Sequence, residues 1–176
     1  YDARGSVLFE KICCLPEYYL TRCEIEALEI VAPDILQDVS ETDFVELGSG
    51  ASRKIKVVLE AADRGQRRNI RYIPVDVSGE YLRQSALELV HCFPEVAVQG
   101  VVADFTRHLE VLPSSRQRVF FFLGSTLGNL TDEEILGFLS DLAGNMKPGD
   151  HLLLGLDMLK SRDVLERAYN DSKGVT

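Results

Sequence analysis

The stretch Asp43-Phe44-Val45-Glu46-Leu47-Gly48-Ser49-Gly50 decides the fold class. The first five residues predict a short, mainly apolar strand that runs directly into a glycine-rich turn. After the turn, Arg53 to Arg64 carries apolar side chains at helical spacing and predicts a helix. The stretch is thus one strand–turn–helix unit, and the rest of the chain shows whether the unit repeats.

The same alternation of strand and helix continues to the end of the chain. Further strands are expected at Asn69–Val75, Ala97–Ala103, Arg118–Leu123 and His151–Leu156. Helices are expected after Ser78, after a capping box at Thr131–Glu134, and over Ser161–Tyr169. Apolar strands that alternate with helices predict a parallel sheet covered on both faces. With right-handed crossovers, the expected fold is α/β, a doubly wound Rossmann-like sheet.

The first 40 residues have a different character. They contain no strand pattern, so we expect a helical segment over 1–40 and the sheet domain over 41–176. A short helix is expected over Ser6–Cys14. A second is expected to begin at a capping box, Thr21 to Glu24, and to stop at Pro33. Because the first residue is Tyr and the last residues follow a helical pattern, we also expect a fragment of a longer protein.

Composition and charge exclude several classes of function. The longest apolar run, Val119 to Leu123, is far too short to cross a membrane. With 19 Lys and Arg against 28 Asp and Glu, the net charge is −9, which disfavours a general nucleic-acid binder. The four cysteines and three histidines have no zinc spacing, so no metal site is expected. The expected compartment for such unpaired thiols is the cytoplasm.

Ligands of doubly wound sheets bind beyond the carboxyl ends of the strands. Three strand ends there carry suitable groups: Gly48-Ser49-Gly50, Asp76, and the pair Asp104 and Phe105. The glycines allow close approach of a ligand, an acid after the second strand can bind ribose hydroxyls, and an acid beside an aromatic ring suits adenine. Arg53 replaces the third glycine of the dinucleotide fingerprint, which disfavours a pyrophosphate. The set predicts a nucleoside such as S-adenosylmethionine (SAM).

Each of these features also has a plain structural interpretation. A glycine pair suits any tight turn, Asp76 suits a helix cap before Ser78, and Asp104 suits a loop beside a core phenylalanine. The string Phe122 to Leu130, with two glycines and three small polar residues after the fourth strand, lies where a methyl acceptor would sit. It also suits a connector that caps the next helix.

On these residues the chain resembles the SAM-dependent, histidine-specific methyltransferases, which trimethylate the α-amino group of L-histidine to hercynine on the route to ergothioneine. The resemblance covers nearly the whole chain and rests on seven strings: Tyr1–Ser6, Leu15–Tyr19, Glu46–Gly50, Pro74–Ser78, Asp104–Thr106, Leu123–Asn129 and Lys147–Asp150. One departure is Leu20-Thr21, where the family commonly has Pro and Thr.

The resemblance implies a class I SAM-dependent methyltransferase and a set of site residues. SAM is expected at Gly48, Ser49, Gly50, Lys54, Asp76, Asp104 and Phe105. Histidine is expected at Tyr18, Tyr19, Gly124, Asn129 and Tyr169. The family's contacts to the imidazole ring are expected in a segment that follows Thr176.

Asn129 is the expected catalytic residue. Its amide oxygen can accept a hydrogen bond from the substrate amine while its N–H donates to the substrate carboxylate. Such a pair of contacts would aim the amine lone pair at the methyl group. Three alternatives stay open: a methyltransferase of another small amine, a Rossmann-type dehydrogenase, and a non-catalytic SAM-binding module. A small-molecule substrate is expected, without nucleic acid or membrane, and the oligomeric state is left open.

Overall fold

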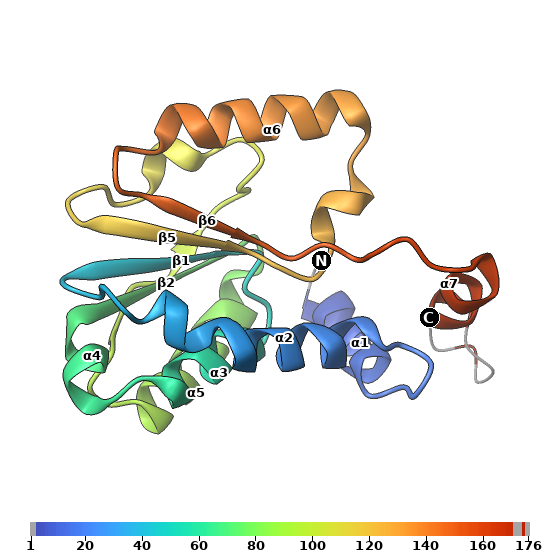
Figure 1. The fold of residues 1–176 in the computed structure, drawn as a ribbon, viewed down its shortest axis with the longest axis horizontal. Helices are drawn as coiled ribbons and strands as arrows, with labels where there is room; N and C mark the ends of the chain where they lie inside the picture. Colours follow the sequence, from blue (N-terminus) through green and yellow to red (C-terminus); the bar gives the residue numbers. More distant parts are fainter. Residues whose placement is uncertain (1–2, 171–173, 175–176) are drawn as a thin grey trace.

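One parallel sheet forms the centre of the molecule, whose computed structural model describes residues 3–170 and residue 174 (Figure 1). Among these residues the strand order is β3-β2-β1-β5-β6, and β4 also pairs with β2. Every pairing is parallel. The strands are β1 (Thr42–Leu47), β2 (Ile70–Asp76), β3 (Ala97–Val98), β4 (Val101–Val102), β5 (Gln117–Phe122) and β6 (His151–Leu154).

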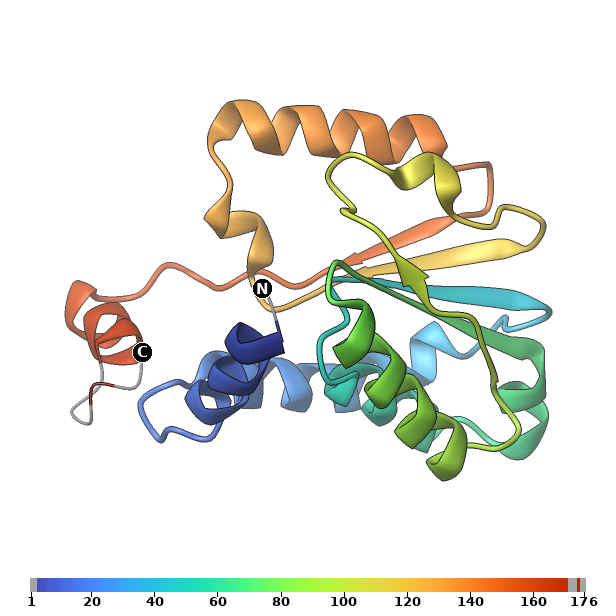
Figure 2. The same ribbon diagram turned by 180° about the vertical axis from the view of Figure 1, so that it is seen from behind.

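Helices cover both faces of the sheet, as Figures 1 and 2 show. Successive side chains of a strand point to opposite faces, so Phe44 packs into one core and Val45 into the other. The helices on the two sides differ in number. One face carries α2 (Leu20–Ile35), α3 (Arg53–Ala61), α4 (Arg64–Asn69) and α5 (Gly79–Cys92); the other carries α6 (Asp132–Asn145) and the 3₁₀ turn η1 (Leu109–Val111). The predicted doubly wound α/β sheet is confirmed.

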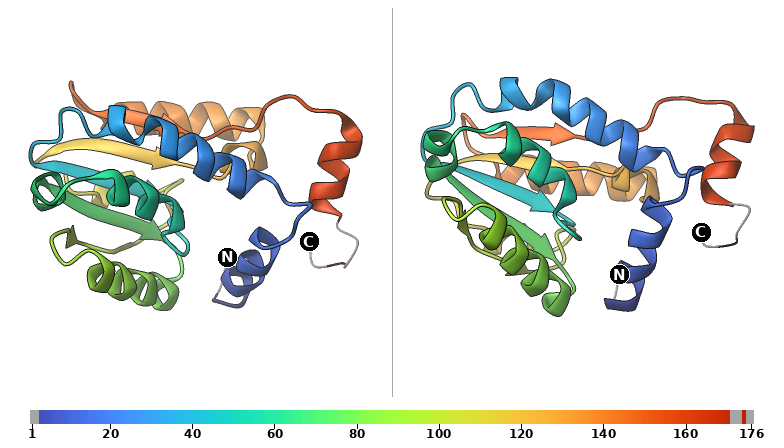
Figure 3. Two further views of the ribbon diagram at one scale, coloured as in Figure 1. Left: turned by 60° about the horizontal axis from the view of Figure 1, so that its bottom comes forward. Right: turned by 90° about the horizontal axis from the view of Figure 1, so that it is seen from below.

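Two helices lie beyond the carboxyl edge of the sheet, where the strand arrows end (Figure 3). They are α1 (Ala3–Cys13) and α7 (Arg162–Tyr169). A third, smaller core joins them to the start of α2, and its buried members are Cys13, Leu15, Tyr18, Leu20 and Ala168. The edge at which ligands of this fold bind is therefore flanked by the two ends of the described chain.

The start and end of α2 differ from the prediction. The proposed capping box at Thr21 and Glu24 is wrong, because α2 begins at Leu20, and its N-cap, Tyr19, makes no capping hydrogen bond. Thr21 instead donates a hydrogen bond to the sulfur of Cys13 (3.3 Å). The helix also continues past Pro33 to Ile35. A proline this close to a helix end removes one of the last backbone hydrogen bonds without breaking the helix.

Two other elements are divided. The helix predicted over Arg53–Arg64 ends at Ala61, because Asp63 caps a separate helix, α4, through a reciprocal pair with Gln66 (2.8 and 2.9 Å). The strand predicted over Ala97–Ala103 is interrupted at Gln99 and Gly100 and forms β3 and β4. By contrast, the capping box from Thr131 to Glu134 is confirmed at the start of α6.

No helix of the described residues is long and apolar enough to cross a membrane. Over the same part of the chain, no group of three or more His, Cys, Asp or Glu side chains could hold a metal ion.

Candidate functional site

The glycine turn after β1 needs glycine for two reasons. Gly48 and Gly50 have φ of +72° and +49°, a region that strains other residues. A Cβ at Gly48 would also lie 3.3 Å from the ring of Phe105. The backbone of this turn is therefore open to a ligand on one side and closely supported by Phe105 on the other.

Asp76, at the end of β2, holds this turn in place. One carboxylate oxygen accepts a hydrogen bond from the N–H of Gly50 (3.1 Å) and the other from the N–H of Ser78 (3.0 Å). Ser78 is the N-cap residue of α5, but its own side chain makes no capping bond. Each oxygen of Asp76 keeps a lone pair that a ligand hydroxyl can use. Asp76 thus has the structural role that the sequence allowed, and its free lone pairs leave it able to accept hydrogen bonds from a ligand as well.

Asp104 and Phe105 lie beside Asp76, because the N–H of Ala103 donates to the backbone oxygen of Asp76 (3.1 Å). Hydrogen bonds from the side chain and the backbone of Thr106 hold the pKa of Asp104 below its usual range. Phe105 packs edge-on against two rings of the α6 side of the sheet, Phe122 and Phe138. The three expected cofactor-binding strand ends are therefore neighbours.

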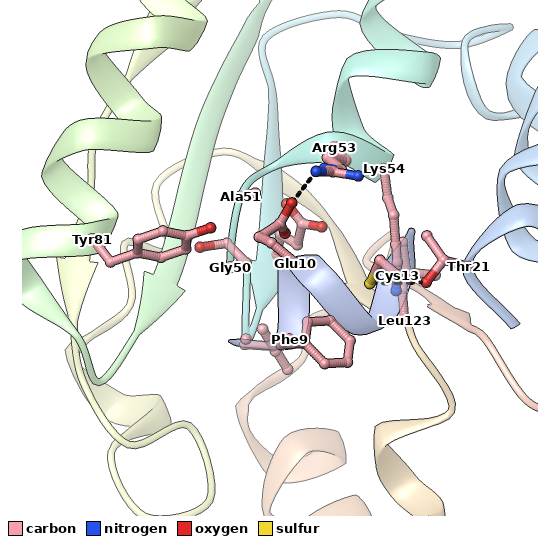
Figure 4. A pocket seen from close by; sticks show the side chains of 14 residues that line it. Phe9, Glu10, Cys13, Thr21, Gly50, Ala51, Arg53, Lys54, Tyr81 and Leu123 are labelled. Carbon is pink, nitrogen blue, oxygen red and sulfur yellow. Dashed lines mark hydrogen bonds and ion pairs between the residues drawn. The ribbon is translucent and has the colours of Figure 1, made fainter. Parts of the chain in front are cut away.

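A cavity opens between the glycine turn and α1, and Figure 4 shows its lining. Lys54 and Leu123 line it from the sheet side, and an ion pair between Glu10 and Arg53 spans from α1 to α3. Asp76, Asp104 and Phe105 are not among the residues that line it. The full lining is Phe9, Glu10, Cys13, Thr21, Glu46, Leu47, Gly48, Ser49, Gly50, Ala51, Arg53, Lys54, Tyr81 and Leu123.

Glu46 is an acid of this cavity that we did not predict as a site residue. Its side chain is buried on β1, and burial raises its pKa to about 7, while a hydrogen bond from the hydroxyl of Tyr72 opposes the rise. The hydroxyl of Tyr72 also lies 2.9 Å from that of Ser52. The signal in the sequence was a glutamate among the apolar residues Phe44, Val45 and Leu47. In the glycine turn that follows β1, the side chain of Ser49 is also buried, and a hydrogen bond with its hydroxyl opposes the rise in the pKa of Tyr72 that burial causes.

The two tyrosines of the Leu15–Tyr19 string face different partners. Tyr18 is buried in the third core, and its ring meets that of Tyr169 edge-on at 5.9 Å. Tyr19 instead donates a hydrogen bond to Asp157 (2.5 Å), and the ammonium of Lys160 lies over its ring. Burial, together with that hydrogen bond, raises the pKa of Tyr19. The structure therefore brings Tyr18 and Tyr169 together and leaves Tyr19 with the segment that follows β6.

Gly124 and Asn129 belong to the loop after β5. Gly124 has φ of +84°, and its N–H donates to the carboxylate of Glu24 on α2. Asn129 ends a 3₁₀ turn, η2 (Thr126–Asn129), with an exposed side chain. It does not line the cavity at the glycine turn. Gly124 is thereby linked to Lys54, one of the expected cofactor residues, because the ammonium of Lys54 pairs with the same Glu24 carboxylate.

Comparisons with known proteins agree on one family. The family model described as "Histidine-specific methyltransferase, SAM-dependent" matches residues 1–176. The chain is 44% identical over 177 residues to the histidine N-alpha-methyltransferase of Mycobacterium tuberculosis, covering 100% of this chain and 54% of that protein. It is 33% identical over 181 residues to the ergothioneine biosynthesis protein 1 of Neurospora crassa, covering 100% of this chain and 20% of that protein. The chain thus spans about half the length of the bacterial relative.

Among solved structures, the chain is similar to the CurJ carbon methyltransferase, with a TM-score of 0.58 and 20% identity. The match covers 83% of this chain and 38% of that one. This likeness concerns the fold alone, and it confirms the class I SAM-dependent methyltransferase fold that the resemblance implied.

Proposed function

Because the chain belongs to the family of SAM-dependent, histidine-specific methyltransferases, we propose that it carries the SAM-binding part of an enzyme that methylates the α-amino group of L-histidine. The product would be hercynine, for ergothioneine biosynthesis. The observation that carries this proposal is the family match along the whole chain, on a fold whose adjacent strand ends present the expected cofactor residues.

The residues at the strand ends fit SAM. The glycine turn leaves backbone accessible, and Asp76 has lone pairs for two hydroxyls. The residues that we propose for SAM are Gly48, Ser49, Gly50, Lys54, Asp76, Asp104 and Phe105.

When bound, SAM supplies a methyl group on a sulfonium that needs no further activation. The residues of the chain would then mainly orient the substrate. Asn129 is proposed to hold the amino and carboxylate groups of histidine, with Gly124, Tyr18, Tyr19 and Tyr169 around it. The amine must be neutral to attack, and an uncharged amide does not favour its protonated form.

The same proposal assigns a role to each part of the chain. Residues 1–40, with α1 and α2, would contribute to the substrate site, and residues 41–176 would bind SAM. The third core supports this assignment, because it places Tyr18 between α1 and α7 at the carboxyl edge of the sheet.

The test is the binding of S-adenosylhomocysteine to the Asp76→Ala variant of the full-length protein, measured by titration calorimetry. Removal of a charged hydrogen-bond partner should cost about 2–4 kcal/mol of binding free energy. The matched control is Asp141→Ala, an exposed aspartate on α6. Unchanged affinity in Asp76→Ala would remove this residue from the site.

Substrate identity needs a second measurement, the transfer of labelled methyl groups to histidine and to other amino acids by the wild-type protein. Transfer to histidine is expected. Transfer to another amine alone would show that this amine, and not histidine, is the substrate. SAM binding without transfer to any amine would favour a binding module.

A further inference from the structure

Glu24 lies where three parts of the fold meet. Its carboxylate accepts hydrogen bonds from the N–H of Gly124, at 2.7 and 3.0 Å for the two oxygens. One of these oxygens also lies 2.6 Å from the ammonium of Lys54. The side chains of Glu24 and Lys54 are only 15% and 17% exposed, so this ion pair is far better shielded from water than an ordinary surface pair.

Two glycines lie against this ion pair. A Cβ at Gly155, just after β6, would lie 1.9 Å from the carboxylate of Glu24. A Cβ at Gly124 would lie 2.8 Å from the ammonium of Lys54. A side chain at either position would therefore displace one member of the pair, Glu24 at Gly155 or Lys54 at Gly124.

The attachment of α2 to the sheet does not require this glutamate. Leu28 and Ala32 are buried in the main core and dock the helix there. A shielded ion pair is often no more stabilising than apolar side chains of the same size. What the pair provides instead is a fixed geometry: it ties the amide of Gly124 and the head group of Lys54 to the helix that follows Tyr18 and Tyr19.

We propose that Glu24 is a positioning residue for methyl transfer, which holds Lys54 at the cofactor side and Gly124 at the substrate side in one arrangement. This inference rests on the proposed function, since it takes Lys54 and Gly124 as ligand-binding groups. The inference adds Glu24, which acts through both Lys54 and Gly124 and belongs to neither the proposed SAM-binding residues nor the proposed histidine-binding residues.

The test compares Glu24→Gln with Glu29→Gln, an exposed glutamate on the same helix, in the full-length protein. Glutamine keeps the size and one acceptor oxygen but loses the charge that holds Lys54. We expect the Kd for S-adenosylhomocysteine and the KM for histidine each to rise about tenfold in Glu24→Gln, the usual scale for loss of a charge-assisted contact. Both constants should stay at wild-type values in Glu29→Gln.

Two results would overturn the proposal. A lower melting temperature with unchanged Kd and KM would make Glu24 a purely structural residue. Tighter binding of S-adenosylhomocysteine would mean that its carboxylate competes with the ligand for Lys54 and Gly124.

A double-mutant cycle with Lys54→Met tests the coupling directly. Glu24→Gln combined with Lys54→Met should bind S-adenosylhomocysteine no more weakly than Lys54→Met alone, because the charge acts through the lysine. Independent, additive losses would contradict the proposal.

The calorimetric measurements also separate this inference from the proposed function. If the wild-type protein binds S-adenosylhomocysteine but methylates an amine other than histidine, the substrate assignment fails, while the Kd values still decide the role of Glu24.

Discussion

Glu46 shows how a single residue can link pH to stability. Its carboxyl group is buried on β1, against the hydroxyl of Tyr72. When the acid is protonated it can donate to Tyr72, whose own proton can then go to Ser52. When it is ionised, Tyr72 must donate to it instead. Both forms can therefore be hydrogen-bonded, but only the neutral form avoids the cost of a buried charge.

We predict that Glu46→Gln changes the pH dependence of folding. The pKa of Glu46 rises from 4.5 to about 7 on burial, so the folded state holds its proton more tightly than the unfolded state. The stabilisation by the proton is complete below about pH 4.5 and is lost as the pH rises through about 7, a change of about 3 kcal/mol. Glutamine stays neutral, so its unfolding free energy should lack this decline.

Urea unfolding of both proteins across this pH range measures the effect. The advantage of Glu46→Gln over wild type should grow with pH, and a pH-independent difference would show that the buried acid does not titrate there.

Asn129 carries the prediction about chemistry at the residue scale. Its side chain is exposed at the end of η2, so Asn129→Asp should fold normally. The new carboxylate would repel the substrate carboxylate and favour the protonated, unreactive amine. We expect kcat/KM for histidine to fall about 10²-fold or more, with little change in SAM affinity. An equal loss of SAM binding would make Asn129 structural, and unchanged turnover would mean that another group holds the amine.

At the scale of elements, the start of α6 depends on a pair of local hydrogen bonds. The hydroxyl of Thr131 accepts from the N–H of Glu134 (3.3 Å), whose carboxylate accepts from the N–H of Thr131 (2.8 Å). We predict that Thr131→Ala lowers the free energy of unfolding by about 1 kcal/mol. Ser140→Ala, an exposed serine within the same helix, should change it by less than about 0.5 kcal/mol. Equal effects of the two variants in chemical denaturation would show that the cap contributes nothing.

The contrast between two predicted capping boxes shows what a local pattern can establish. The box at Thr131 could be predicted because both partners are three residues apart and face solvent. The same pattern at Thr21 failed, because Glu24 is bound by Gly124, 100 residues away. Asp63 and Gln66 show the converse, since their spacing signals a cap and divides a helix that apolar periodicity alone had joined.

At the scale of the whole molecule, topology explains why the closeness of the proposed cofactor residues could be predicted and the contacts of Glu24 and Glu46 could not. The carboxyl ends of parallel strands share one edge, so Gly48, Asp76 and Asp104 must lie close together once the sheet is predicted. Glu24 and Glu46 act through contacts with Lys54 and Tyr72 that depend on how helices and strands pack. No spacing in the sequence encodes such contacts.

The third core gives the last prediction, which concerns cooperativity. The buried cluster around Tyr18 joins α1, α7 and the start of α2, and it is separate from the two cores on the faces of the sheet. Tyr18→Ala should therefore open this cluster locally, and hydrogen exchange should become faster in α1 and α7 but not in β1 or β5. Tyr18→Phe keeps the ring and should raise the exchange rates of these helices less than Tyr18→Ala does. Because the cluster also holds Tyr18 against Tyr169, the KM for histidine should rise in Tyr18→Ala while S-adenosylhomocysteine binds nearly as before. Faster exchange throughout the sheet would instead mean that α1, α7 and the sheet unfold as one unit.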